Sequence, residues 1–346
     1  MSPIATILDP IGDDRWGAFI GRSPDATAFH HPAWLRLLRD QYGYEMSAVC
    51  VEDEHGEIVG GLPLARVRSL LTGTRLSALP FSDACPLLLA RGASPSTADA
   101  LIDALRDEQL RHDLKLEVRD WLPHLGGGPG ERFYHHVLKL GPNVGAVEAG
   151  FSKSQVQRGI KKARREEVTI ERAISRAALD DFYRLHVQTR RRQGVPTQPR
   201  RFIRRFETLF EDGLGFVLVA RWQGKAIAGA VFLAFNGNLI YKYGASQQEH
   251  LGKRPNNLLF MEAIRWGCEN GMRQLDFGRT DIDNDGLRAF KRAWGAEERV
   301  LTYTRLPARP GRSAAPAGSA PLGFVIRRSP ALVGQLVGTA LYRHVG

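Results

Sequence analysis

Residues 216–234 read FVLVARWQGKAIAGAVFLA, and this stretch decides the fold. Two apolar runs flank a short polar turn, which predicts an antiparallel β-hairpin. Residues 46–66, MSAVCVEDEHGEIVGGLPLAR, have the same design. A shift of 168 positions superposes the two stretches without a gap, so that Val49 falls on Val217. The sequence therefore predicts an internal duplication.

The elements around the two hairpins recur in the same order. The same shift aligns two helical stripes, in which apolar residues follow the i, i+1, i+4, i+8 spacing of a buried face. They are Trp34, Leu35, Leu38 and Tyr42, and Phe202, Ile203, Phe206 and Phe210. A later helix and strand match at a shift of 159, where Leu116 falls on Leu275. We expect a mixed α/β sheet in each of two domains, residues 1–145 and 146–307.

Composition and cysteine usage limit the class of protein. Of 346 residues, 43% are hydrophobic and 25% are charged, which is typical of a globular chain rather than a disordered one. The three cysteines, Cys50, Cys85 and Cys268, are odd in number and have no C-x-x-C spacing. A reducing compartment is therefore expected, so that the sequence favours the cytoplasm.

The positive charge is concentrated in two segments. Residues 151–205 contain 16 Lys/Arg and five Asp/Glu, and residues 301–346 contain six Lys/Arg and no acidic residue. Within the first segment, Lys161, Lys162, Arg164 and Arg165 crowd one predicted helix. Such a cluster predicts an anion-binding surface, although a solvated helix face is the alternative.

The end of the chain divides into a linker and a helix. Residues 308–321 are rich in Pro, Ala, Gly and Ser, which predicts a flexible linker. Residues 322–346 predict a basic amphipathic helix, with an apolar stripe that includes Leu336 and Ala340. This tail is expected to lie on an anionic membrane surface at the inner face of the cell membrane. A helix that packs on the protein itself is the alternative.

Several motifs together resemble the FemAB-like branch of the GNAT acyltransferase superfamily. They are the hairpin end Ile58–Leu64, Leu79–Asp83, Tyr241–Ser246, Pro255–Leu259, Asp276–Thr280, Gly286-Leu287, Phe290-Lys291 and Trp294–Ala296. The resemblance covers residues 30–306 and implies two tandem GNAT-like domains. It also implies an enzyme that transfers an acyl or aminoacyl group to an amine of a cell-envelope or exopolysaccharide precursor.

The resemblance implies direct attack by the acceptor amine, without a Ser or Cys nucleophile. The donor is either an acyl-CoA or an aminoacyl-tRNA, so that tRNA is a potential partner while DNA and a metal ion are not expected. Two alternatives stay open. One is an acetyl-CoA-dependent N-acetyltransferase of a small soluble amine. The other is a non-catalytic basic module that binds RNA or lipid on a decayed acyltransferase fold.

The matched motifs also indicate site residues. Lys291 is expected to hold the donor and to stabilise developing negative charge. Asp276 is expected to accept a proton or orient the amine, or else to pair with Arg279. Tyr241 and Tyr243 are expected on one strand face, and asparagines 256 and 257 are expected to cap a helix. The residues assigned to substrate binding are Arg279, Tyr243, Ser246, Asn256 and, in the first domain, Asp83.

Overall fold

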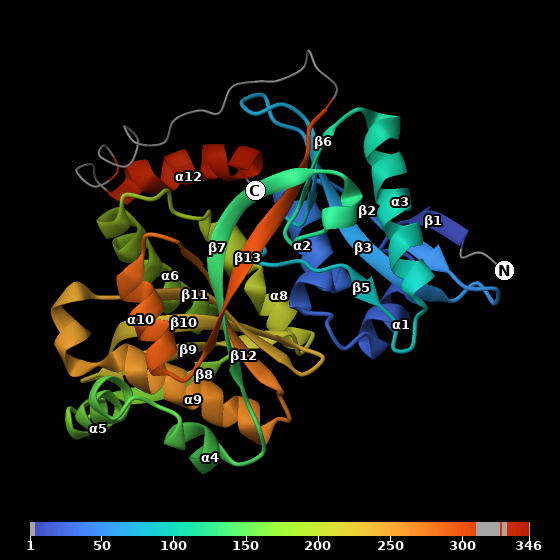
Figure 1. The fold of residues 1–346 in the computed structure, drawn as a ribbon. Helices are drawn as coiled ribbons and strands as arrows, with labels where there is room; N and C mark the ends of the chain where they lie inside the picture. Colours follow the sequence, from blue (N-terminus) through green and yellow to red (C-terminus); the bar gives the residue numbers. More distant parts are fainter. Residues whose placement is uncertain (1–3, 309–325, 327–330, 346) are drawn as a thin grey trace. The chain divides into compact units, whose positions relative to one another are not determined.

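The computed structural model describes residues 4–308, 326 and 331–345 (Figure 1). The chain forms two compact units. Among the described residues, unit 1 contains 4–133, 300–308 and 342–345, and unit 2 contains the rest. The expected domains are residues 1–145 and 146–307. In the structure, the chain passes from unit 1 to unit 2 after Phe133 and returns to unit 1 at Val300. There, Thr304 of the last strand pairs with Val118.

Unit 1 is a mixed sheet with three main helices. Its strands, in spatial order, are β1 (Ile4–Leu8), β2 (Glu45–Glu52), β3 (Ile58–Val67), β4 (Arg75–Ala78), β6 (Lys115–Val118) and β13 (Glu297–Leu306), and β5 (Leu88–Leu89) pairs with β3. Its helices are α1 (Asp14–Arg22), α2 (Pro32–Tyr42) and α3 (Pro95–His112), with 3-10 turns η1 (Ala28–His30) and η2 (Pro123–Leu125). The β4 and β6 strands are parallel, whereas β2 and β3 form the expected antiparallel hairpin.

Unit 2 repeats this plan with more helices. Its spatial strand order is β7 (Gly128–Lys139, of which the residues from 134 onward belong to this unit), β12 (Gln274–Asp281), β11 (Asn238–Ser246), β10 (Lys225–Phe235), β9 (Gly215–Trp222) and β8 (Thr169–Ala173). The early helical segments are α4 (Val144–Ala149), the π-helical turn η3 (Lys153–Gln157), α5 (Arg158–Arg165), α6 (Arg176–Gln193), α7 (Arg200–Arg204) and α8 (Phe206–Glu211). The later ones are η4 (Gln248–Lys253), α9 (Pro255–Glu269), α10 (Asp285–Ala293) and α12 (Ala331–Val345). Figure 1 shows α6 and α9 on opposite faces of this sheet.

The predicted duplication is confirmed by strand register. Leu76 pairs with Leu116 in the parallel ladder of unit 1, and Leu239 pairs with Leu275 in that of unit 2. Both pairs join the strand that directly follows the hairpin of a unit, β4 or β11, to the strand that follows its long helix, β6 or β12. The two aligned helical stripes are buried, as expected, although the second is divided between α7 and α8 at Arg205.

Local turn chemistry explains the tight hairpins of unit 2. Gln223 and Gly224 both have positive φ, 49° and 75°, between β9 and β10. Asn236 and Gly237 do the same between β10 and β11, with φ of 45° and 74°. Two consecutive positive φ values match the twist of antiparallel strands, which explains why Gly and Asn occur there.

Two neighbouring strands of unit 2 diverge. The parallel ladder of β11 and β12 runs from Asn238–Gln274 to Ile240–Asp276, whereas β11 continues to Ser246 and β12 to Asp281. Parallel strands normally share hydrogen bonds along their length, but β11 and β12 form no ladder with each other beyond Ile240 and Asp276. This divergence positions the candidate site.

The C-terminal helix α12 packs on the protein. In unit 2, the carbonyl of Gly334 accepts a hydrogen bond from the Thr197 amide at 3.1 Å, and Gly338 lies against the Thr197 backbone. In unit 1, the Tyr44 hydroxyl donates to the carbonyls of Tyr342 and Arg343. The structure therefore agrees with the alternative in which the helix packs on the protein itself. Two glycines make the contact, and Leu336 of the expected apolar stripe is 62% exposed.

The predicted linker and the first part of the tail lie outside the described residues, apart from positions 308 and 326. Among the helices that the structure describes, none combines the length and the apolar character that crossing a bilayer requires.

Candidate active site

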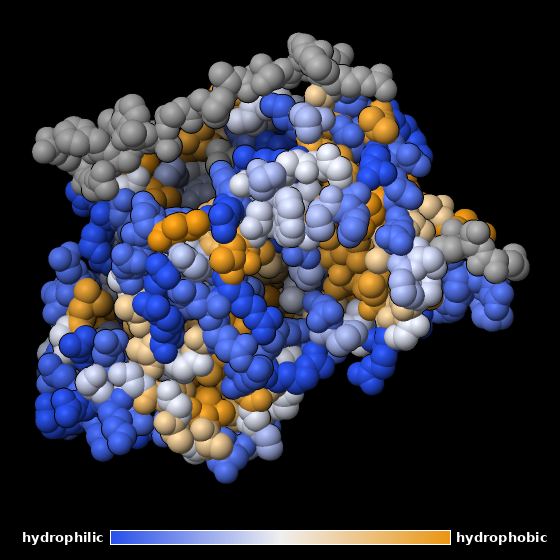
Figure 2. All heavy atoms as spheres, in the orientation of Figure 1, coloured by the Kyte–Doolittle hydropathy of each residue, from blue (hydrophilic) through white to orange (hydrophobic). Residues whose placement is uncertain are grey.

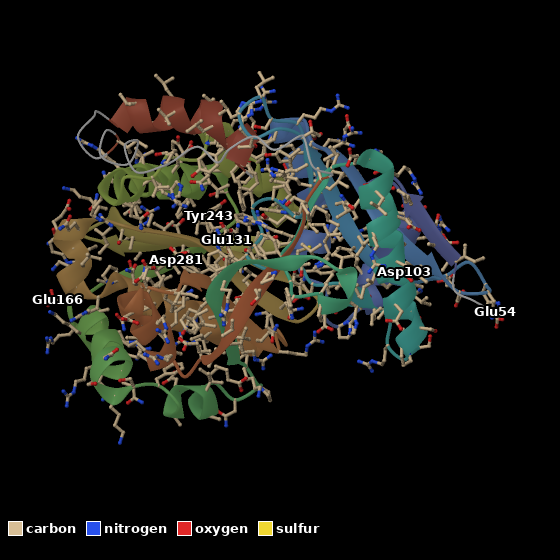
Figure 3. The ribbon with its side chains drawn as sticks, turned by 45° about the horizontal axis from the view of Figure 1, so that its top comes forward. Glu54, Asp103, Glu131, Glu166, Tyr243 and Asp281 are labelled. Atoms are coloured by element: carbon tan, nitrogen blue, oxygen red, sulfur yellow. The ribbon has the colours of Figure 1, made fainter. Side chains whose placement is uncertain are left out.

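A β-bulge marks the point where β11 leaves β12. Tyr241 is opposite Phe232 and Tyr243 is opposite Val231, so that Lys242 is an extra residue in the ladder. The bulge turns the two tyrosines to opposite faces, and the expectation that they share a face is wrong. Tyr241 packs on Phe260 of α9, with ring centroids 4.8 Å apart. Tyr243 instead packs within unit 2 against α6 (Figure 3).

Lys291 is buried beside the diverging strand. Its side chain comes from α10, which begins after Asn284, whose side chain accepts a hydrogen bond from the Leu287 amide. The residue is only 2% exposed, and its Nζ atom donates to the carbonyls of Gly278 at 2.8 Å and Arg279 at 3.1 Å. Lys291 is therefore a fixed internal cation and not a solvated helix residue.

Asp276 has a partner that the sequence did not indicate. Its Oδ1 atom lies 2.8 Å from Nε2 of His135 on β7, and it also accepts a hydrogen bond from the Gly278 amide at 2.7 Å. The two side chains are 14% and 18% exposed, so the pair is largely shielded from solvent. Leu275 and Phe277 are buried, as the predicted alternation along the strand requires.

A second histidine anchors the neighbouring part of β7. His136 is fully buried, and its Nε2 atom lies 2.9 Å from Oε2 of Glu298. The same carboxylate accepts two hydrogen bonds from Arg288 of α10, whose guanidinium lies 3.7 Å from the centre of the Tyr134 ring. This network connects α10 to the strand that presents His135.

The electrostatics keep the carboxylates ionised. Burial by itself would raise the pKa of Asp276, but the charge and hydrogen bond of His135, the Gly278 amide and the Lys291 charge hold that pKa below its usual value. The hydrogen bond from Arg288 lowers the pKa of Glu298 to about 2, with burial opposing the effect and His136 assisting it. Burial and the Lys291 charge lower the pKa of His136.

The remaining predicted substrate residues are not all gathered at this point. Arg279 adjoins the Lys291 contact through its own carbonyl. Ser246 ends β11, where its carbonyl accepts hydrogen bonds from Thr189 and Arg192 of α6. Asp83 belongs to unit 1, where its carbonyl accepts a hydrogen bond from Tyr303 at 2.7 Å.

The start of α9 differs from the expected asparagine cap. The cap residue is Arg254, in a left-handed conformation with φ of 60°, and asparagines 256 and 257 lie inside the first turn. Asn257 instead donates to the carbonyl of Gln155 at 3.2 Å, while Asn256 is half-buried. The turn therefore contacts the basic segment.

The basic helix α5 packs against this turn. Gly159 is so close to Asn257 that a Cβ atom added to it would lie 2.6 Å from the amide nitrogen. Lys161, Arg164 and Arg165 are exposed and Lys162 is half-buried, while Glu166, at the edge of the unit in Figure 3, pairs with Lys253 at 2.9 Å. Figure 2 shows a hydrophilic surface over α5 at the lower left. The four predicted cations thus lie together beside the N-terminal turn of α9.

Comparison with protein families identifies this region. Residues 150–292 match the family model of the acetyltransferase (GNAT) domain. They form a GNAT domain. The matched region includes Asp276 and Lys291. His135 lies outside it, because β7 ends at Lys139, before the matched region begins.

The relatives and solved structures agree with the FemAB-like resemblance. A lipid II:glycine glycyltransferase of Staphylococcus epidermidis is 35% identical over 79 residues, which are 21% of this chain and 19% of that protein. The chain thus spans about a fifth of the length of the curated relative. The crystal structure of FemX has a TM-score of 0.69 at 16% identity, and covers 86% of this chain and 96% of its own.

A tandem GNAT protein from the clavulanic acid biosynthesis pathway has a TM-score of 0.53 at 17% identity, and covers 90% of this chain and all of its own. At these identities, the structural likeness establishes the fold. The expected architecture, two GNAT-like domains in a mixed α/β arrangement, is confirmed, and so is the FemAB-like GNAT resemblance.

Sequence reasoning missed His135 and its neighbour. The two histidines are adjacent in the sequence, a spacing that does not suit a helical metal site, and no motif singles them out. Among the described residues, no group of three or more potential ligands could hold a metal ion. The usable signal was the alternation of Phe133, His135 and Val137 along one strand, which predicts a common face.

Proposed function

We propose that the protein transfers an aminoacyl or other acyl group to the amine of a cell-wall precursor. The observation that carries this proposal is the divergence of β11 and β12, with Lys291 and the His135–Asp276 pair beside it. Where two neighbouring strands stop pairing with each other, the backbone of an extended donor can hydrogen-bond to one of them. Within the described chain, the buried hydroxyl of Thr280 on diverging β12 also has no hydrogen-bond partner.

The reaction is a direct acyl transfer. The amine nitrogen attacks the carbonyl carbon of the donor's ester or thioester, and the bond from that carbon to the leaving oxygen or sulfur breaks. The amine gives up one proton and the leaving group takes one. The His135 imidazole accepts the amine proton, and the Asp276 carboxylate orients the ring and stabilises its charged form.

Lys291 supplies positive charge to the same region. Two carbonyl oxygens hold its ammonium group in place, so that no reorganisation of the charge is needed during the reaction. The contact also fixes the Gly278–Arg279 backbone, which borders the Asp276 carboxylate. We assign to Lys291 both positioning of this segment and stabilisation of the developing negative charge.

An aminoacyl-tRNA is the donor that the surface of unit 2 favours. The exposed side chains of Lys161, Arg164 and Arg165 present several positive charges along α5, which fits a polyanion better than a single pyrophosphate. The relative acts, by its name, on lipid II and glycine, which supports a cell-wall precursor as acceptor. Such an acceptor would place the protein at the inner face of the cell membrane.

A transfer assay tests the proposal. The full chain is incubated with tRNA charged with labelled glycine, or with labelled acetyl-CoA, and with lipid II as acceptor. Label from the charged tRNA is expected in the precursor and is expected to disappear in Asp276→Asn. Label from acetyl-CoA on a small soluble amine would instead support the alternative N-acetyltransferase, and no transfer from either donor would support a non-catalytic module.

A further inference from the structure

The loop between β3 and β4 exposes two adjacent leucines. Leu70 is 98% exposed and Leu71 is 51% exposed, and Leu70 is the most exposed of the large apolar side chains that the structure describes. A single exposed leucine is ordinary on a protein surface. Here two consecutive leucines lie at the tip of a loop, and Leu70 makes almost no contact with the protein. Together they form a small apolar projection.

The loop is held in this shape by its own hydrogen bonds. The buried hydroxyl of Ser69 accepts hydrogen bonds from the amides of Leu71 at 3.1 Å and Thr72 at 2.9 Å. The Thr72 hydroxyl donates to the carbonyl of His344, in the last turn of α12. Gly73 has φ of 76°, which allows the chain to turn back toward β4. The projection of Leu70 is therefore built into the fold and does not result from a loose loop.

Basic residues surround the base of the projection. No acidic residue occurs between Glu57 and Asp83, whereas Arg66, Arg68 and Arg75 flank the leucines. Glu45 pairs with both Arg66 and Arg68, so one carboxylate faces two guanidinium groups. The hairpin formed by β3 and β4 therefore keeps a net positive charge.

The segment that meets the loop is basic as well. Arg75 donates to the carbonyl of His344, so the hairpin is attached to the C-terminal turn of α12. The chain has no acidic residue after Glu298, and Arg343 is exposed in that same turn. Two acid-free segments that are distant in the sequence therefore meet in unit 1.

We infer that this hairpin docks the protein on an anionic lipid bilayer, with Leu70 and Leu71 inserted among the acyl chains. Apolar side chains on a basic base are the chemistry of interfacial anchors. A stable protein interface buries about 800 Å² on each side, more than two leucines offer. The inference deepens the proposed function, on which it rests for a membrane-linked acceptor. It names the β3–β4 loop as the anchor in place of the C-terminal helix α12.

Vesicle sedimentation tests the anchor. The full chain is mixed with vesicles of phosphatidylcholine containing about 30% phosphatidylglycerol, and binding is compared with the Leu70→Ser/Leu71→Ser variant. Loss of two inserted leucines is expected to weaken binding at least about tenfold. Leu110→Ser is the matched control, because Leu110 is 45% exposed on α3 of the same unit and is expected to have no effect. Unchanged binding of the double variant would overturn the inference.

A probe at position 70 reports insertion directly. The three native cysteines are buried, so Leu70→Cys can be labelled selectively with the environment-sensitive dye NBD. Its emission is expected to shift to the blue and strengthen with phosphatidylglycerol vesicles, but not at Leu110→Cys. Equal responses at both sites, or none at position 70, would contradict the inference.

The two experiments distinguish failure of the proposed function from failure of the membrane anchor. Binding and insertion as expected, without transfer from any donor, would remove the function and keep the anchor. Transfer to lipid II in vesicles that is unaffected by the double leucine variant would keep the function and remove the anchor.

Discussion

The Nζ atom of Lys291 lies 2.8 Å from the carbonyl oxygen of Gly278 and is almost completely removed from solvent. The contact connects α10 to the strand that leaves the parallel ladder after Asp276. A residue in this position supports the local fold as well as any reaction beside it.

Replacement of Lys291 by methionine is expected to reduce both activity and stability. Methionine retains most of the volume but removes the donor to the carbonyls of Gly278 and Arg279, which costs about 1–3 kcal/mol at the buried Gly278 contact. We expect transfer to fall at least about 100-fold, because the fixed positive charge is lost as well. Urea denaturation and the transfer assay measure the two effects.

Lys291→Arg serves as the control for charge. Arginine keeps the positive charge but places it in a larger planar group, so stability should recover more than activity. Wild-type transfer by the methionine variant would remove Lys291 from the site.

The His135–Asp276 pair predicts a specific change in the pH profile. Asp276→Asn removes a negative charge 2.8 Å from the imidazole, so the ring is deprotonated more easily and the acid limb of kcat/KM moves to lower pH. The rate at the optimum is expected to fall by about 10²–10⁴, the range for loss of general base catalysis. His135→Gln should remove the acid limb, whereas an unaltered limb in both variants would assign the pair to structure alone.

These two residues show where the sequence suffices and where it does not. The position of Asp276 follows from a short alternating strand, and the register of Leu116 and Leu275 follows from the internal repeat. His135 contacts Asp276 across 141 positions of sequence, and no periodicity within either strand specifies that contact.

The bulge at Lys242 shows the same limit. In an ideal strand, Tyr241 and Tyr243 lie on one face. The additional residue in the ladder turns the side chain of Tyr243 to the opposite face. That residue is specified by packing on both faces of the sheet and not by local pattern. The packing of α12 likewise depends on close backbone contact at Gly334 and Gly338. The apolar stripe that predicts the helix does not indicate this contact.

Two buried histidines predict how stability changes with pH. Burial lowers the pKa of His30 to about 4 and that of His186 to about 3, so both are neutral when folded. In the unfolded chain they take up protons near pH 6.5. The free energy of unfolding should therefore be unaffected by them above pH 6.5. Below it, each should lower that energy by about 1.4 kcal/mol per pH unit, until its folded pKa is reached.

Guanidinium denaturation between pH 7 and 4.5 measures this slope. In His186→Asn the slope should decrease by the share of one histidine, since asparagine does not titrate. A slope identical to that of the wild type would show that His186 is protonated in the folded protein.

The charges of α5 distinguish a nucleic acid donor from a small one. Reversal of Lys161 and Arg164 to glutamate is expected to raise KM for aminoacyl-tRNA with little change in kcat, because these exposed side chains lie outside the Lys291 region. If they neutralise phosphates, the dependence of log affinity on log salt should become shallower by about 0.7–0.9 for each contact removed. Lys225→Glu, an exposed cation on β10, is the matched control and should leave the slope unchanged. An acyl-CoA donor carries too few phosphates for a steep slope, so equal and shallow slopes in all three proteins would exclude the tRNA contact while leaving the chemistry at Asp276 intact.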